Sequence, residues 1–130
     1  MKYILLNYFD EKAWAALGEA EQQRIKAGRL PHVHRLLADG KFLGGAGLQP
    51  TSAAATVSLQ NGKRLVTDGP FAETREQLAG YALIDATDLD EAINIAVGFL
   101  CESDPSRLEV RPLLEAAGVP SHSAEVSNKA

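Results

Sequence analysis

The side chains best suited for chemistry in this sequence are one carboxylate and two histidines. The carboxylate, Asp68, opens the segment Asp68-Gly69-Pro70-Phe71. Asp hydrogen-bonds readily to backbone that follows it, Gly accepts positive φ, and Pro fixes φ near about −65°, so this segment predicts one defined turn. Such a turn can hold a carboxylate in a fixed position for proton transfer. The alternative is that Asp68 only bonds backbone amides, and the two roles can coexist.

The other reactive residues do not form a familiar site. His32-Val33-His34 brings two imidazoles together, but no third ligand lies at a usual spacing, so we expect no metal. Gly44-Gly45-Ala46-Gly47 lacks the pattern of a dinucleotide loop, and no Walker lysine motif occurs, so we expect no cofactor. Cys101 falls in an expected helix, where it is interpreted as a packed apolar group. As a lone cysteine it also favours a reducing compartment, and hence the cytoplasm.

Length and composition predict one soluble globular domain. The chain has 130 residues, 45% of them hydrophobic and 23% charged, which suffices for a core without metals or disulfides. A net charge of −4 disfavours nucleic acid, which needs a cationic surface. The apolar run near the N-terminus meets Asp10 and Glu11 too early for a targeting segment, and no run reaches membrane-spanning length.

Hydrophobic patterns and turn residues predict six strands and two helices. A helix over residues 11–39 is expected to break at Gly18 and to kink or restart between Gly28 and Pro31. Asp88 and Glu91 form a capping box that opens the second helix, in which Leu89, Ile93, Ala96 and Leu100 share one face. The expected strands cover residues 3–8, 42–49, 54–60, 64–67, 80–86 and 108–112, with the Asn61-Gly62 turn joining the third to the fourth.

This order predicts a ferredoxin-like α+β fold with an inserted hairpin, in which two helices cover one face of an antiparallel sheet. The other face then has no helix to cover it. A second copy of the chain is the simplest cover, so we expect a homodimer that forms an α+β barrel with a cavity between the sheets. The domain is expected to span residues 1–114, and residues 115–130, poor in large apolar groups, are expected to form a mobile tail.

Four segments of the chain resemble a known family. They are Met-Lys-Tyr-Ile-Leu-Leu at the start, Gly-Leu-Gln-Pro at 47–50, Val-Thr-Asp-Gly-Pro-Phe-Ala-Glu-Thr-Arg-Glu-Gln-Leu at 66–78 and Glu-Val-Arg-Pro at 109–112. In these segments the chain is similar to the DGPF-domain branch of the YCII-related proteins. The resemblance implies a dimeric α+β barrel. It also implies that the chain is one of a group of small bacterial proteins, some of which are encoded beside extracytoplasmic-function sigma factors.

The resemblance also implies an acid/base pair, made by a histidine on the first helix and an aspartate near the strands. Asp68 is the candidate carboxylate. Counting back from Gly40, the histidine position of the relatives falls near Arg29, whereas the histidines of this chain are His32 and His34.

Helical geometry favours one of the two histidines. Leu30, Val33 and Leu37 define an expected buried stripe, and His34 lies near its edge while His32 points further round. A carboxylate beside His34 would raise its pKa and suit it for proton transfer near neutral pH. The alternative is that both histidines are surface residues of the helix.

Two functions of different kinds remain open. The first is a cofactor-independent enzyme in which Asp68, with or without His34, acts as acid or base on a small molecule in the barrel cavity. Its expected substrate-binding residues are Arg29, His32, Phe71 and Glu73, although Glu73 also fits a solvated charge cluster and Phe71 a core or dimer contact. The second is a non-catalytic ligand-binding or accessory protein linked to sigma-factor regulation. Monooxygenase-like chemistry, suggested by the barrel alone, is a distant third.

Overall fold

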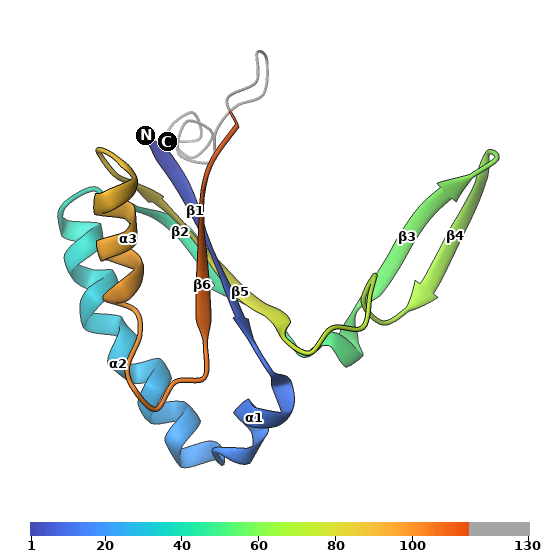
Figure 1. Ribbon diagram of the computed structural model, residues 1–130, viewed down its shortest axis with the longest axis horizontal. Coiled ribbons are helices and arrows are strands. Elements are labelled where there is room, and N and C mark those ends of the chain that lie inside the picture. The colour runs from blue at the N-terminus through green and yellow to red at the C-terminus, as the bar shows by residue number, and fades with distance from the viewer. Residues whose placement is uncertain (115–130) are drawn as a thin grey trace.

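The protein has an α+β fold with one main antiparallel sheet, seen in a computed structural model that describes residues 1–114 (Figure 1). The expectation for residues 115–130 lies outside the described residues. The elements are, in chain order, β1 (Lys2–Phe9), α1 (Glu11–Ala16), α2 (Glu19–Ala38), β2 (Phe42–Gly47), a 3-10 turn (Thr51–Ala53), β3 (Ala55–Gln60), β4 (Lys63–Asp68), β5 (Gln77–Asp85), α3 (Leu89–Val97) and β6 (Arg107–Pro112).

The main sheet has the strand order β2-β5-β1-β6, and every neighbouring pair is antiparallel. With α2 and α3 as connections, this is the β-α-β-β-α-β arrangement of a ferredoxin-like fold. Both helices lie on the same face of the sheet (Figure 1). The strands β3 and β4 pair only with each other and project away from this layer as a separate hairpin (Figure 1). We call β3 and β4 the arm.

The core lies between the sheet and the two helices. Side chains alternate between the faces of a strand, so Tyr3 and Leu5 of β1 point to the helices together with Ile84, the pairing partner of Tyr3. All three are at most 2% exposed, and Leu36 of α2 and Ile95 of α3 pack against them. Burial of these side chains is the main force that holds the helices on the sheet.

The first helical region divides at Gly18, as expected. The side chain of Asp10 accepts a hydrogen bond from the backbone of Lys12 and begins α1, and Gly18 adopts a φ of 83° between α1 and α2. Of the kink or restart expected between Gly28 and Pro31, the restart is wrong, because α2 is continuous from Glu19 to Ala38 with Pro31 inside it. Pro31 removes only the donor for the carbonyl of Ala27, and Ala27 is exposed, so water can bond that carbonyl.

The buried stripe of α2 differs from the one expected, and α3 buries a face made mostly of small residues. On α2 the buried residues are Ile25 and Leu36, whereas Leu30 and Leu37 are each 53% exposed. On α3 the buried face consists of Ala92, Ile95 and Ala96, while Leu89 and Ile93 are exposed. The expectation followed the largest side chains. The structure instead turns small residues inward on α3, because alanines let the helix approach the sheet closely.

The turn of the arm matches its prediction. Asn61 and Gly62 have φ of 51° and 76°, the positive values that a tight primed hairpin turn requires at both central positions. The segment after the arm begins at Gly69, whose φ is 92° and whose amide donates to the carbonyl of Ala54 at 2.7 Å. This bond holds the two ends of the arm together.

Candidate functional site

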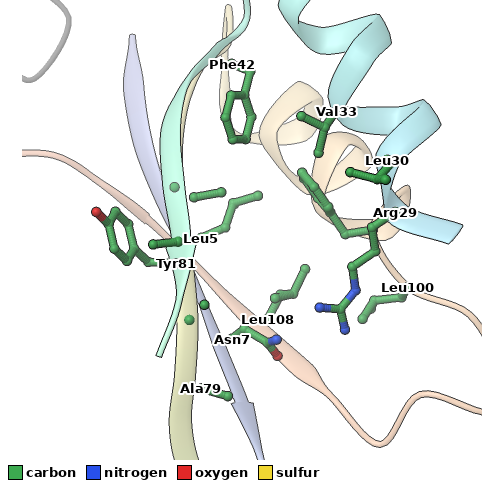
Figure 2. Close-up of a pocket in the computed structure, with 16 residues that line it drawn as sticks. Leu5, Asn7, Arg29, Leu30, Val33, Phe42, Ala79, Tyr81, Leu100 and Leu108 are labelled. Atoms are coloured by element: carbon green, nitrogen blue, oxygen red, sulfur yellow. The ribbon is translucent and has the colours of Figure 1, made fainter. Parts of the chain in front are cut away.

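A cavity of about 380 Å³ lies between α2 and the sheet. Most of its lining is aliphatic or aromatic. Leu30 and Val33 of α2 lie across from Leu5 of β1, and Phe42 of β2 lies toward the end near α3 (Figure 2). The volume falls within the range of about 300–1,000 Å³ that is usual for small-molecule sites.

The floor of the cavity depends on two glycines. A Cβ on Gly45 would fall 2.6 Å from the carbonyl oxygen of Tyr81, and one on Gly80 would fall 2.9 Å from that of Ala46. Real Cβ atoms do not approach backbone so closely, so β2 and β5 can pair at this place only with glycine. The absence of side chains there also leaves room above the sheet.

Among the described residues that line the cavity, Arg29 is the one with a charged side chain. It follows Ile25 by four residues and precedes Leu36 by seven, so α2 directs it to the same face as these two buried side chains. Its Nη2 donates to Oδ2 of Asp104 at 2.5 Å, and the Asp104 side chain is fully buried. The other oxygen of Asp104 accepts from the amide of Ser106 at 2.9 Å. Arg29 is therefore held in place.

Two polar atoms at this site are buried without a hydrogen-bond partner, Nε of Arg29 and Oδ1 of Asn7. Asn7 follows Tyr3 and Leu5 on the helix-facing side of β1, and its amide lies at the same end of the cavity as the Arg29 guanidinium (Figure 2). An unpaired buried polar atom costs about 1–3 kcal/mol, so such atoms are rare. A donor and an acceptor in this state at one end of an apolar cavity fit the polar group of a bound molecule.

The lining residues offer binding but little acid/base chemistry. The guanidinium of Arg29 presents only N–H donors and no acceptor. The ring of Tyr81 points to the other side of the sheet, so this residue reaches the cavity through its backbone (Figure 2). Asp104 is committed to Arg29 and Ser106. The arrangement can orient a small molecule through hydrogen bonds and apolar contacts.

The expected acid/base pair is not brought together within one chain. His34 is exposed on α2, so the expectation that it points inward is wrong. Asp68 is exposed at the end of β4, and the arm lies on the far side of the sheet from α2 (Figure 1). The catalytic roles of Asp68 and His34 stay a prediction.

His32, in contrast, points inward and joins the two helices. Its Nε2 lies 2.8 Å from the carbonyl oxygen of Ile95, and its ring meets Phe99 edge-on at 4.7 Å between centroids. A Cβ on Gly98 would fall 2.5 Å from the same Nε2. His32 thus has a structural role in the contact between α2 and the end of α3.

Arg29 alone of the four residues expected to bind substrate lines the cavity. Phe71 is 91% exposed and Glu73 is exposed, both in the segment between the arm and β5. Sequence reasoning missed Asn7 and Asp104. No local pattern marks Asp104, whereas the alternation of side chains along β1 is a signal that places Asn7 on the same face as buried Leu5.

Three groups in the described part of the chain have clearly shifted pKa values, and they lie outside the cavity. Hydrogen bonds to Glu21 raise the pKa of Arg24, and hydrogen bonds to Glu109 raise that of Arg111. The amide of Thr87 and then the ammonium of Lys41 donate to the Glu91 carboxylate and lower its pKa. These shifts describe surface contacts of the helices and of β6.

Residues 1–114 lack two further features. No three side chains of His, Cys, Asp or Glu gather there in a group that could hold a metal ion. None of the helices in that range combines the length and the apolar character needed to cross a membrane.

Comparison with known proteins shows the family of this chain. Residues 1–105 match the model of the YCII-related domain. The chain is also 42% identical over 115 residues to an uncharacterized protein of Rhizobium meliloti (strain 1021), a match that covers 87% of this chain and 92% of the relative. The protein therefore belongs to the family defined by the YCII-related domain.

Proposed function

We propose that this protein binds a small, largely apolar molecule in the cavity between α2 and the sheet, as a binding protein rather than an acid/base enzyme. The observation that carries the proposal is the unpaired donor of Arg29 and the unpaired acceptor of Asn7 at one end of an apolar cavity. The lining supports binding over catalysis, because it is mostly apolar, and Arg29, its charged member among the described residues, is committed to Asp104.

A pair of matched variants tests this proposal. Leu30 and Leu37 are both 53% exposed on α2, but Leu30 lines the cavity mouth and Leu37 does not. We expect that Leu30→Trp blocks the cavity and abolishes binding of small amides and aromatic fragments, whereas Leu37→Trp leaves it unchanged. The measurement is an NMR titration of the backbone amides of Gly45 and Gly80. Equal binding by both variants, or no shift of these amides with any fragment, would contradict the proposal.

We further propose that the arm packs on a second copy of the chain, giving a homodimer. Pairing places Val57 opposite Val66, and these side chains are 66% and 50% exposed. Leu59, on the same face of the arm as Val57, is 74% exposed. An isolated two-stranded hairpin is at best marginally stable in water, so a partner surface is needed to keep the arm folded.

The oligomeric state in solution tests the dimer. We expect sedimentation equilibrium to give twice the chain mass for the wild type and the single-chain mass for Leu59→Glu. Val97→Glu is the control, because Val97 is 61% exposed on α3, away from the arm. A wild type that sediments as a monomer at micromolar concentration would exclude the dimer, as would a Leu59→Glu variant that stays dimeric.

A further inference from the structure

We infer that the cavity selects an uncharged head group that both donates and accepts hydrogen bonds, such as a primary amide or an alcohol, on an apolar body. The inference rests on the proposed binding function and narrows it to one class of ligand. Two independent features of the cavity support this inference. The first is the charge balance between Arg29 and Asp104, and the second is the pair of polar atoms, one donor and one acceptor, that have no hydrogen-bond partner.

The charge at the polar end is already balanced. The guanidinium of Arg29 and the carboxylate of Asp104 form an ion pair at 2.5 Å, with the Asp104 side chain fully buried. A ligand carboxylate would be attracted by Arg29 but repelled by Asp104. It would also lose its hydration inside an apolar cavity, and for an ion this loss is large unless an opposite charge remains free to compensate it. An uncharged head group avoids this cost.

The unpaired atoms require a ligand of mixed hydrogen-bonding character. Nε of Arg29 is a donor and needs an acceptor, while Oδ1 of Asn7 is an acceptor and needs a donor. A carboxylate only accepts and an ammonium only donates, so each satisfies one atom and leaves the other unpaired. A primary amide or a hydroxyl group can do both. Because the two side chains lie at the same end of the cavity, one small head group is enough (Figure 2).

The opposite end of the cavity defines the body of the ligand. Leu30, Val33 and Phe42 lie there, and all three present hydrocarbon surface (Figure 2). A single ring or a short alkyl chain fits a volume of about 380 Å³. Burial of such a body supplies the favourable free energy, while the head group sets its orientation.

Matched ligands that differ mainly in charge test the head group. Benzamide is compared with benzoate, and hexanamide with hexanoate, at pH 7.5, with Kd taken from the NMR shifts of the Gly45 and Gly80 amides. We expect the wild type to bind each amide about tenfold more tightly than the matching carboxylate. Asp104→Asn keeps an acceptor for the Ser106 amide but frees the charge of Arg29, so we expect the preference to reverse in favour of the carboxylates.

Two variants complete the design. Glu21→Gln removes a carboxylate from the exposed Arg24 pair on the same helix, and we expect it to keep the wild-type preference. Asn7→Leu removes the acceptor without changing charge, so we expect the amides to weaken about tenfold and the carboxylates to stay unchanged. If Asp104→Asn does not fold, as judged by circular dichroism, Asn7→Leu still decides the question.

The outcomes separate this inference from the function it rests on. Wild-type protein that binds the carboxylates as tightly as the amides, with binding lost in Leu30→Trp, would overturn the head-group selection and leave the binding function intact. Amide binding that survives Asn7→Leu at full strength would also overturn it. If no member of either pair shifts the cavity amides of the folded wild type, the binding function itself fails.

Discussion

Nη2 of Arg29 lies 2.5 Å from Oδ2 of Asp104, and the contact joins two parts of the chain that are 75 residues apart. Arg29 comes from the middle of α2, and Asp104 from the segment between α3 and β6. The pair therefore ties the first helical connection to the last one at the edge of the cavity. It also leaves a buried carboxylate that depends on a single guanidinium for its charge compensation.

Removal of Arg29 should destabilise the protein strongly. Arg29→Met leaves the Asp104 carboxylate buried without a counter-charge, and breaking a buried ion pair from one side costs about 3–5 kcal/mol. Because the Arg29 side chain is 25% exposed, we expect the lower end, about 3 kcal/mol. The measurement is urea unfolding followed by circular dichroism. In an Asp104→Asn background the same change should cost about 2 kcal/mol less, and strictly additive effects would show that the pair is not coupled.

His32 and His34 should differ in their effect on stability, although they lie on the same helix. His32→Ala removes the contacts with the Ile95 carbonyl and the Phe99 ring, and we expect a loss of about 1–3 kcal/mol. His34 is exposed, so His34→Ala should change stability by less than about 0.5 kcal/mol. Thermal unfolding gives both values. An equal loss for the two variants would contradict the structural role of His32.

Gly98 should tolerate a methyl group only when His32 is absent. A Cβ at position 98 would fall 2.5 Å from Nε2 of His32, so Gly98→Ala should cost about 1–3 kcal/mol in the wild type through overpacking. The backbone itself accepts alanine, because Gly98 has a φ of −63°. We therefore expect Gly98→Ala to be nearly neutral in a His32→Ala background. A full cost in both backgrounds would mean that the imidazole is not what Gly98 avoids.

Gly45 and Gly47 of β2 form another matched pair. Gly45→Ala places a Cβ 2.6 Å from the Tyr81 carbonyl, whereas one at Gly47 meets nothing within 4 Å. We expect Gly45→Ala to cost about 1–3 kcal/mol and to weaken ligand binding, because β2 must move relative to β5 at the cavity floor. Gly47→Ala should leave the stability unchanged, because its Cβ meets nothing within 4 Å. The measurements are urea unfolding and the amide titration, and a neutral Gly45→Ala would be inconsistent with the close approach of these strands.

Glu91 makes the stability of the protein fall as the pH is lowered into the acid range. Its folded-state pKa is lowered by the Thr87 amide and by Lys41, so its contribution is complete above about pH 5 and is lost as the pH falls through the lowered pKa. We expect Glu91→Gln to unfold at lower temperature than the wild type at pH 7, with the gap closing below about pH 5. Asp90→Asn, a change in the same helical turn, is the control. A gap that stays constant down to pH 3 would contradict this linkage.

Local signals in the sequence predicted most of the architecture. Gly18 divided the helices, Asn61-Gly62 made the hairpin turn, and Asp88 capped α3 by accepting from the amide of Glu91. These features depend on a few adjacent residues, so their physical chemistry can be read without the tertiary structure. The carboxylate of Glu91 bonds the amide of Thr87, one residue before the cap, and so completes a close variant of the expected capping box.

The candidate site could be predicted only in part, because it depends on contacts between distant segments. Asp104 and Arg29 come into contact only in the folded chain, and the residues around either one do not indicate the other as its partner. The choice of His34 over His32 failed for a related reason. It relied on a stripe of large aliphatic residues, but the side of α2 that faces the sheet carries Arg29 and His32, which periodicity counts as polar.

The arm enters and leaves the main sheet at neighbouring strand ends. Gly47 at the end of β2 pairs with Gly80 of β5, and the amide of Leu48 donates to the carbonyl of Ala79 at 2.8 Å. The residues between these points add no strand to the main sheet. We therefore expect that shortening or exchanging the arm, or inserting a tag at its tip, leaves unchanged the order of the strands that enclose the cavity.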